Sequence, residues 1–176
     1  MRHNLTVGAG RAAPLFRSSN FWTTRPAIKA GYGYRFLTNL QADMDFMTTF
    51  SPGQDMFRAF RLLEGDIGGG ALYSLSFGGR GILPLRQERF FLSLGAGAVC
   101  ERYSGPQLKP DALGRRISLD ESGWGAYALV SAGVALDRRH RFRLAVTPRM
   151  HIVNSQQAFL HRDRWLIVLG EFSVGF

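Results

Sequence analysis

Apolar and polar residues alternate along most of this chain, most clearly at its end. In the stretch Trp165–Phe176, the residues counted back from Phe176 in steps of two are apolar near the chain end. The residues between them are small or charged there. A period of two places successive side chains on opposite faces of an extended chain, so this stretch predicts a β-strand with one apolar face. A terminal phenylalanine suits the aromatic girdle of a membrane barrel.

The same alternation recurs upstream and predicts further strands. These strands are expected at Asn4–Gly10, Ala27–Phe36, Leu40–Met47, Ala71–Leu83, Phe90–Tyr103, Trp124–Leu136 and Arg141–Val153. The short connection at Leu37–Asn39 predicts an antiparallel hairpin. Because Pro148 cannot donate a hydrogen bond within a paired strand, we expect a β-bulge there. The sequence thus predicts about eight strands in one domain, residues 1–176.

The connections between these strands alternate in length. Short connections are expected at Leu37–Asn39, Pro84–Glu88 and Asp137–His140, and longer ones at Arg11–Arg25, Thr48–Gly70, Ser104–Ser122 and Asn154–Asp163. Short turns on one side and longer loops on the other are typical of small outer-membrane barrels. We therefore expect an all-β fold: an eight-stranded antiparallel up-and-down transmembrane β-barrel.

The charged register of the strands carries both signs. We expect it to line the lumen as an ion-pair network of Lys29, Arg35, Asp43, Asp45, Arg80, Glu101, Arg143, Arg149, His151 and Glu171, because buried charges must be paired. The apolar register would then face lipid, with aromatic residues nearer its ends. A soluble barrel of the lipocalin kind, with the apolar register inside, is the alternative.

At this point the chain resembles the small outer-membrane β-barrel family of Gram-negative bacteria, of the OmpA/OmpX-like type. The resemblance covers the whole pattern and is most specific at Phe172, Val174 and Phe176, which match the C-terminal insertion signal; Gly170 lies one position earlier than the usual glycine. It implies export to the outer membrane and insertion by the barrel assembly machinery. The opening residues carry no signal core, so we expect an export signal absent from this chain.

Composition changes this picture little. The net charge is +9, yet the arginines are scattered and no Lys/Arg-rich run is present, so nucleic acid is not an expected partner. A basic surface suits anionic lipid, including lipopolysaccharide. Cys100 stands alone, and the histidines have no metal-ligand spacing, so we expect no disulfide, metal or cofactor.

One motif raises the question of catalysis. Lipid A deacylase barrels carry His-x-Ser-Asn late in the chain, and this chain has His151, Val153 and Asn154 at the comparable place. Val153 cannot act as a nucleophile, so we expect no enzyme activity and keep a lipid A-modifying enzyme as an alternative.

The expected role is structural, surface-binding or in assembly, acting through the long loops. Apolar residues in two of these loops are candidates for contact with a protein partner or a second copy: Phe16, Phe21, Trp22, Met56, Phe57 and Phe60. We expect a lumen filled by side chains rather than an open pore.

Overall fold

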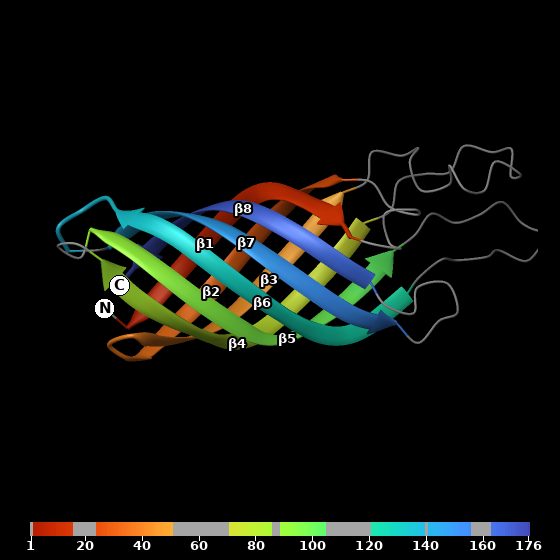
Figure 1. The fold of residues 1–176 in the computed structure, drawn as a ribbon, viewed down its shortest axis with the longest axis horizontal. Coiled ribbons are helices and arrows are strands. Elements are labelled where there is room, and N and C mark those ends of the chain that lie inside the picture. The colour runs from red at the N-terminus through yellow and green to blue at the C-terminus, as the bar shows by residue number, and fades with distance from the viewer. Residues whose placement is uncertain are drawn as a thin grey trace, which may run out of the picture.

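Eight β-strands, each antiparallel to its neighbours, close into a barrel in the computed structural model of this protein (Figure 1). The structure describes residues 2–15, 24–50, 71–85, 89–104, 121–139, 141–155 and 163–176. The strands are β1 (His3–Pro14), β2 (Arg25–Leu37), β3 (Leu40–Phe50), β4 (Ala71–Leu85), β5 (Phe90–Ser104), β6 (Glu121–Ala135), β7 (Phe142–Ser155) and β8 (Asp163–Gly175). The predicted fold class is confirmed.

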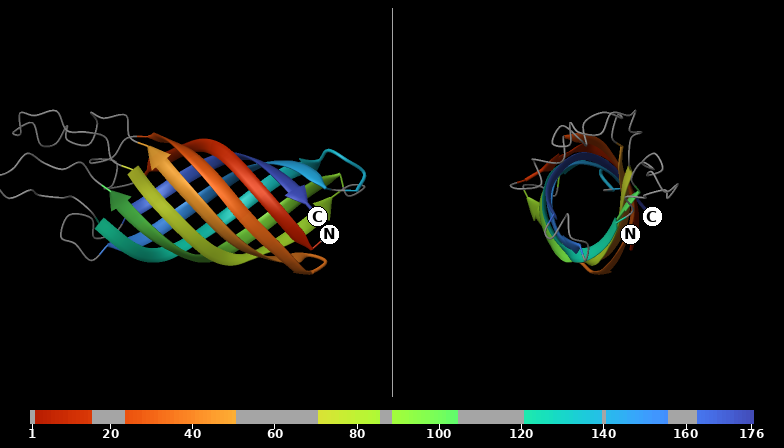
Figure 2. Two further views of the ribbon diagram at one scale, coloured as in Figure 1. Left: turned by 180° about the vertical axis from the view of Figure 1, so that it is seen from behind. Right: turned by 90° about the vertical axis from the view of Figure 1, so that its right-hand side faces the viewer.

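The barrel is closed by pairing between its first and last strands. β1 and β8 pair from Asn4–Gly175 to Pro14–Trp165, and the view along the barrel shows an unbroken ring (Figure 2). At the very end, the His3 amide donates to the Phe176 carbonyl (3.1 Å) and the Phe176 amide donates to the His3 carbonyl (3.0 Å). Closure leaves neither strand with an unpaired edge.

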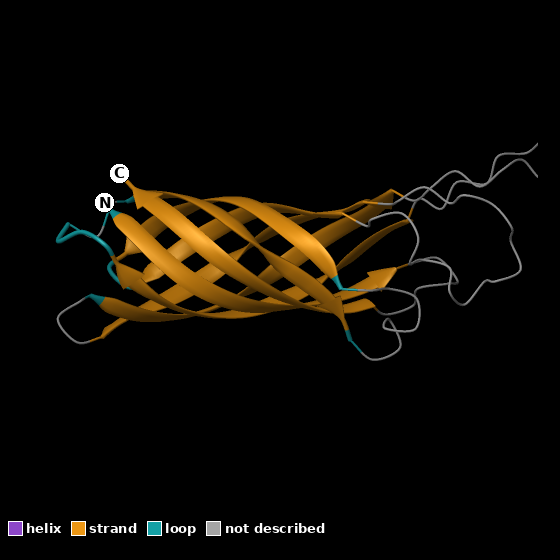
Figure 3. Cartoon of the chain, turned by 90° about the horizontal axis from the view of Figure 1, so that it is seen from above, coloured by secondary structure: helices purple, strands orange, loops and turns teal. Residues whose placement is uncertain are grey.

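Both termini lie at the same end of the barrel as the connections β2–β3, β4–β5 and β6–β7 (Figure 3). We call this the terminus end. The other connections contain residues 16–23, 51–70, 105–120 and 156–162, which lie outside the described residues. They join strands at the opposite end, which we call the far end. The predicted alternation of short and long connections therefore matches the strand order.

Several strands are longer than their sequence pattern predicted. β1 continues to Pro14 and β2 begins at Arg25, although Arg11–Arg25 was expected to be a loop. β4 likewise includes Pro84, which was expected in a turn. Both prolines lie where their strand has a paired neighbour on one side only, because β1–β2 pairing ends at Ala12 and β3–β4 pairing ends at Gly81. A missing N–H group is tolerated at such one-sided positions.

The β-bulge expected at Pro148 is wrong. β6 and β7 pair as Leu129–Arg149 and Ala132–Val146, so the register is the same on both sides of the proline. The ladder is interrupted there without an extra residue. Inside the barrel a hydrogen bond between the Ser131 and Thr147 hydroxyls (2.8 Å) links the two strands across the interruption. The register does shift in β2, by one residue between Arg35 and Leu37.

The apolar register faces outward and the charged register inward. Leu94, Val7 and Val146 are more than half exposed, whereas Lys29, Arg149 and Glu171 are at most 3% exposed. Aromatic side chains on the outer surface include Tyr34, Phe36, Phe90, Phe142 and Phe176 near the terminus end and Phe46, Tyr73 and Trp124 near the far end. This arrangement is the reverse of a soluble lipocalin-like barrel. No helix in the described part of the chain is long and apolar enough to span a membrane.

Candidate functional site in the lumen

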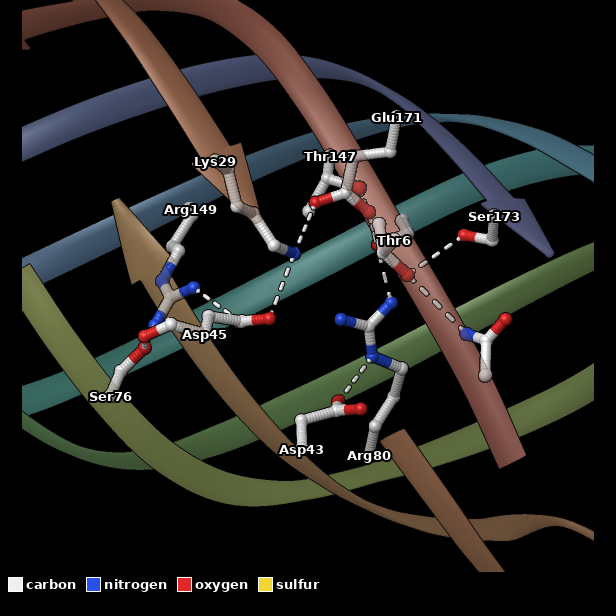
Figure 4. Close-up of polar contacts among 12 residues, drawn as sticks. Thr6, Lys29, Asp43, Asp45, Ser76, Arg80, Thr147, Arg149, Glu171 and Ser173 are labelled. Atoms are coloured by element: carbon white, nitrogen blue, oxygen red, sulfur yellow. Dashed lines mark hydrogen bonds and ion pairs between the residues drawn. The ribbon is translucent and has the colours of Figure 1, made fainter. Parts of the chain in front are cut away.

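Charged side chains from six strands project into the lumen. Strand alternation directs them inward at Lys29 on β2, Asp43 and Asp45 on β3, Arg80 on β4, Glu101 on β5, Arg149 and His151 on β7, and Glu171 on β8. Figure 4 shows the central part of this group, with the cations pointing between carboxylates. Neighbouring strands lie ~5 Å apart, so long side chains can meet across the narrow lumen.

Lys29 lies at the centre and joins two strands. Its Nζ lies 2.6 Å from Glu171 Oε1 and 3.3 Å from Asp45 Oδ1 (Figure 4). Gly31 lies two residues after Lys29, on the same face of β2, and a side chain there would collide with the Asp45 carboxylate. The glycine therefore leaves the room that this ion pair occupies.

Arg80 and Arg149 complete a central network with equal numbers of opposite charges. Arg80 Nε donates to Asp43 Oδ2 (2.8 Å), and its Nη1 lies 3.9 Å from Glu171 Oε2. Arg149 Nη1 donates to Asp45 Oδ2 (2.8 Å). Three cations therefore face three carboxylates, which satisfies the pairing that buried charges require.

The central network is packed as well as paired. Arg149 also donates to the Ser76 hydroxyl (2.5 Å), and its guanidinium carbon lies 3.8 Å from the centre of the Tyr127 ring. A cation over an aromatic face in a desolvated site gains a further attraction. The lumen at this level is filled by contacting side chains.

His151 and Glu101 form a separate pair toward the far end. His151 Nδ1 and Glu101 Oε1 are 2.6 Å apart, and the Ser74 hydroxyl donates to the same oxygen (3.2 Å). His151 is fully buried and faces the lumen, as does Val153. In the motif compared with lipid A deacylases, the histidine is thus directed away from the surrounding lipid.

Besides His151 and Glu101, two more of the expected network members lie apart from the central network. Arg35 and Arg143 are at the terminus end of the lumen, and neither forms an ion pair with a carboxylate among the described residues. Arg143 instead lies over the Phe91 ring, with 5.6 Å between the guanidinium carbon and the ring centre. The expectation that all ten residues form one network is therefore wrong in this part.

An apolar layer inside the barrel was missed by the sequence reasoning. It lies toward the far end of the lumen and contains Ala12, Ala27, Met47, Leu72, Tyr103, Trp165, Ile167 and Leu169, and a second cluster contains Val99, Tyr127, Leu129 and Val153. The signal was present in the closing strand, where both registers are apolar from Trp165 to Leu169. With no alternation to read there, periodicity could not reveal an apolar interior.

The remaining candidates are the residues of the predicted C-terminal insertion signal and the apolar residues of the long loops. Phe176 stacks on His3 at 5.6 Å, and Phe172 stacks on Phe142 at 6.2 Å on the outer surface. Val174 is half-buried and pairs with Leu5 and Phe142. The loop candidates Phe16, Phe21, Trp22, Met56, Phe57 and Phe60 lie outside the described residues.

The described residues offer no ready metal site. They contain no group of three or more histidine, cysteine, aspartate or glutamate side chains placed to hold an ion. Cys100 is a free thiol in the outward register of β5.

Comparison with solved structures places this fold among outer-membrane barrels. Neisserial surface protein A superposes with a TM-score of 0.72 at 14% identity, over 99% of this chain and 97% of the other. OprG of Pseudomonas aeruginosa superposes with a TM-score of 0.63 at 8% identity, over 99% and 96%. The chain thus has the fold of small outer-membrane β-barrels.

The same comparison shows that this kind of fold does not decide function. The outer-membrane protease OmpT of Escherichia coli superposes with a TM-score of 0.50 at 11% identity, over 99% of this chain and 97% of that protein. No protein-family model matches the chain, and no curated protein sequence matches it. Function must therefore be argued from the residues.

Proposed function

We propose that this chain is an integral outer-membrane protein with a closed lumen and a non-enzymatic role. The role is structural, surface-binding or in assembly, and it is exercised through the connections at the far end. Its lipid partners are the outer-membrane lipids, with lipopolysaccharide in the outer leaflet.

One observation carries the proposal: the two faces of the same strands are adapted to different surroundings. The outward face is a band of exposed aliphatic and aromatic residues, whereas the inward face holds paired charges that water barely reaches. An exposed apolar surface that encircles a molecule is costly in water but stable in lipid. The closed ring also leaves no strand of the barrel with an unpaired edge, as lipid requires.

Charges on the outer surface support an orientation in which the far end of the barrel lies in the outer leaflet. Arg11 and Arg102 are exposed, face outward, and lie toward the far ends of β1 and β5. Guanidinium groups at this level suit the phosphate groups of lipopolysaccharide. In barrels with an even strand number, the short turns and both termini face the periplasm, so the longer connections face outward.

The filled lumen supports a role other than transport. The central ion-pair network and the apolar layer follow one another along the barrel, and their side chains are buried except for Arg80, which is 11% exposed. Barrels of eight strands have an interior just wide enough for side chains to fill. Reconstituted protein should therefore give no large stable current in a planar bilayer, and such a current would contradict a closed lumen.

Membrane residence has a direct test. Protein extracted from isolated outer membranes with detergent should migrate faster on an unheated gel than after boiling, because a folded barrel resists the detergent. Full solubility without detergent, or identical migration in both lanes, would overturn the proposal.

The enzyme alternative is tested separately. Purified protein incubated with lipid A should leave every ester intact by mass spectrometry. Ester cleavage that disappears in His151→Ala and Asn154→Ala would replace the non-enzymatic role with a deacylase.

The aromatic loop candidates are tested by replacing Phe57 and Phe60 with serine, which should abolish partner binding or self-association while folding is unchanged.

Insertion by the barrel assembly machinery belongs to the same proposal. The support is the position of Phe176, whose backbone closes the barrel against His3. Phe176→Ser should slow insertion in vivo, whereas the purified variant refolded in detergent should still give the heat-modifiable form. Normal insertion of the variant would remove this part of the proposal.

A further inference from the structure

The terminus end of the lumen holds cations without carboxylate partners. Arg2, Arg35 and Arg143 line a small pocket there together with the carboxamide side chains of Asn4 and Gln41. Deeper in the lumen, Lys29, Arg80 and Arg149 each lie within ion-pairing distance of an acid. No acidic residue lines this pocket.

The two lumen arginines of the pocket act on each other unfavourably. Arg143 is half-buried, and the nearby positive charge of Arg35 opposes its own, while the carboxylate of Asp137 in the β6–β7 turn attracts it more weakly from beyond ion-pairing distance. Like charges in a partly buried site are costly unless a counter-charge lies between them. The described part of the chain supplies no such counter-charge within ion-pairing distance of either guanidinium.

The pocket is held in shape by the residues around it. The ring of Phe91 supports the Arg143 guanidinium, and Gly133 leaves the space for that ring, since a Cβ there would collide with it. The Arg35 amide donates to the Arg2 carbonyl (2.7 Å), which places Arg2 beside the pocket. Gln41 Nε2 donates to Asp43 Oδ1 (2.5 Å) and so ties the inner side of the pocket to the central network.

The space between these groups limits what can enter. Its volume is about 10 Å³, close to the space that one water-sized sphere occupies. This space accommodates one oxygen atom. The remainder of a larger ligand would project into the open mouth.

The surroundings favour the approach of anions. Arg89, Arg138, Arg139 and Arg141 also lie at the terminus end, where Asp137 is the one acidic residue among the described turn residues. A cleft surrounded by charges of one sign raises the local concentration of oppositely charged ligands.

We propose that the terminus-end mouth of the lumen binds the terminal oxyanion of a small ligand, a phosphate monoester or a carboxylate, with one oxygen held between Arg35 and Arg143. Arginine suits this task because its planar guanidinium donates several hydrogen bonds to such oxygens. That this mouth faces the periplasm rests on the proposed function, whereas the anion site itself does not.

The test uses the full-length protein refolded in detergent and labelled with nitrogen-15. Inorganic phosphate is added at constant ionic strength while the side-chain Nε–H signals of Arg35 and Arg143 are followed by nuclear magnetic resonance. We expect both signals to shift and saturate. Arg143→Gln should weaken the apparent affinity about tenfold or more, because it removes charge-assisted hydrogen bonds. Acetate in place of phosphate tests the carboxylate form.

A matched control separates the site from the general positive charge. Arg139→Gln removes the same charge from an exposed turn at the same end, so through the lost long-range attraction it should weaken the affinity only about twofold or less. If Arg143→Gln does not fold, as judged by heat-modifiable migration, Arg35→Gln takes its place. Shifts that never saturate, or equal affinities in the site variant and the Arg139→Gln control, would overturn the site.

The source of the oxyanion is distinguished by a second arm. The protein is placed in nanodiscs of phosphatidylcholine with and without phosphatidic acid, whose headgroup ends in a phosphate monoester. Competition between phosphatidic acid and inorganic phosphate would support the site and assign it to a lipid headgroup. Saturable phosphate binding without competition would support the site and assign it to a soluble ligand. Failure of phosphate and acetate to saturate in either setting would sink the proposal, whatever the outcome of the membrane tests.

Discussion

Removing the central cation of the lumen should destabilise the barrel strongly. In Lys29→Met the side chain keeps most of its length and loses its charge. Glu171 is then left with Arg80 at 3.9 Å as its nearest cation, whereas Asp45 keeps Arg149 at 2.8 Å. Breaking a buried ion pair on one side costs about 3–5 kcal/mol, because the remaining charge stays buried. Since one of the two carboxylates retains a close partner, we expect a loss of about 3 kcal/mol in the free energy of unfolding.

The effect should be largely reversed by removing the orphaned charge. In the double variant Lys29→Met, Glu171→Gln, the pairs Arg80–Asp43 and Arg149–Asp45 are unchanged. A double-mutant cycle should therefore give a coupling free energy of about 1–3 kcal/mol between the two positions.

The assay is equilibrium unfolding in guanidinium chloride, with protein refolded into lipid vesicles and followed by tryptophan fluorescence. Arg139→Met is the control, since it removes a cation from an exposed turn and should change stability by less than about 0.5 kcal/mol. A Lys29→Met variant as stable as this control, or a double variant less stable than Lys29→Met alone, would refute the ion-pair reasoning.

Three further predictions concern other parts of the molecule. Gly31→Val should lower stability by about 1–3 kcal/mol in the same unfolding assay, because its side chain would displace the Asp45 carboxylate; no change would show that the lumen is looser than described. Phe77→Arg, on the outward face near the middle of β4, should cost about 2–4 kcal/mol in vesicles, and an unaffected variant would argue against lipid at that face. In the β6–β7 turn, the Phe142 amide donates to Asp137 Oδ1 (3.0 Å) and lowers the pKa of that carboxyl. The bond therefore stabilises the folded turn above the ordinary carboxyl pKa of ~3.9 and is lost as the pH falls through the lower folded pKa. A titration of the Phe142 amide resonance should have its midpoint below that ordinary value, and a midpoint at or above it would contradict the bond.

Period-two alternation was enough to predict the fold because each strand separates two different environments. Where the inward positions are charged or glycine and the outward ones apolar, as along Lys29–Phe36, the pattern predicts the strand and its two different faces. Near the far end the inward positions are apolar too, as at Met47, Leu72 and Ile167. The contrast between the faces is weaker there, and β1, β3 and β6 extend three or four residues beyond their predicted far ends.

The partners within the lumen depend on register and could not be read from the sequence. Glu171 lies next to Lys29 because β8 pairs with β1 and β1 pairs with β2 in one particular register. The alternation places Arg35 and Arg143 on the inner face as correctly as Lys29. The alternation does not reveal that the carboxylates on the neighbouring strands lie too far along the lumen to pair with these two arginines.

The central claim is that the strands cross a bilayer with the apolar register in lipid and the charged register in a closed lumen. Spin labels attached at consecutive positions from Leu166 to Ser173, in a Cys100→Ser background in lipid vesicles, test this directly by their accessibility to oxygen. Oxygen dissolves in lipid, so accessibility should alternate, high at positions 166, 168, 170 and 172 and low at positions 167, 169, 171 and 173. Uniform accessibility, or the opposite alternation, would contradict the account.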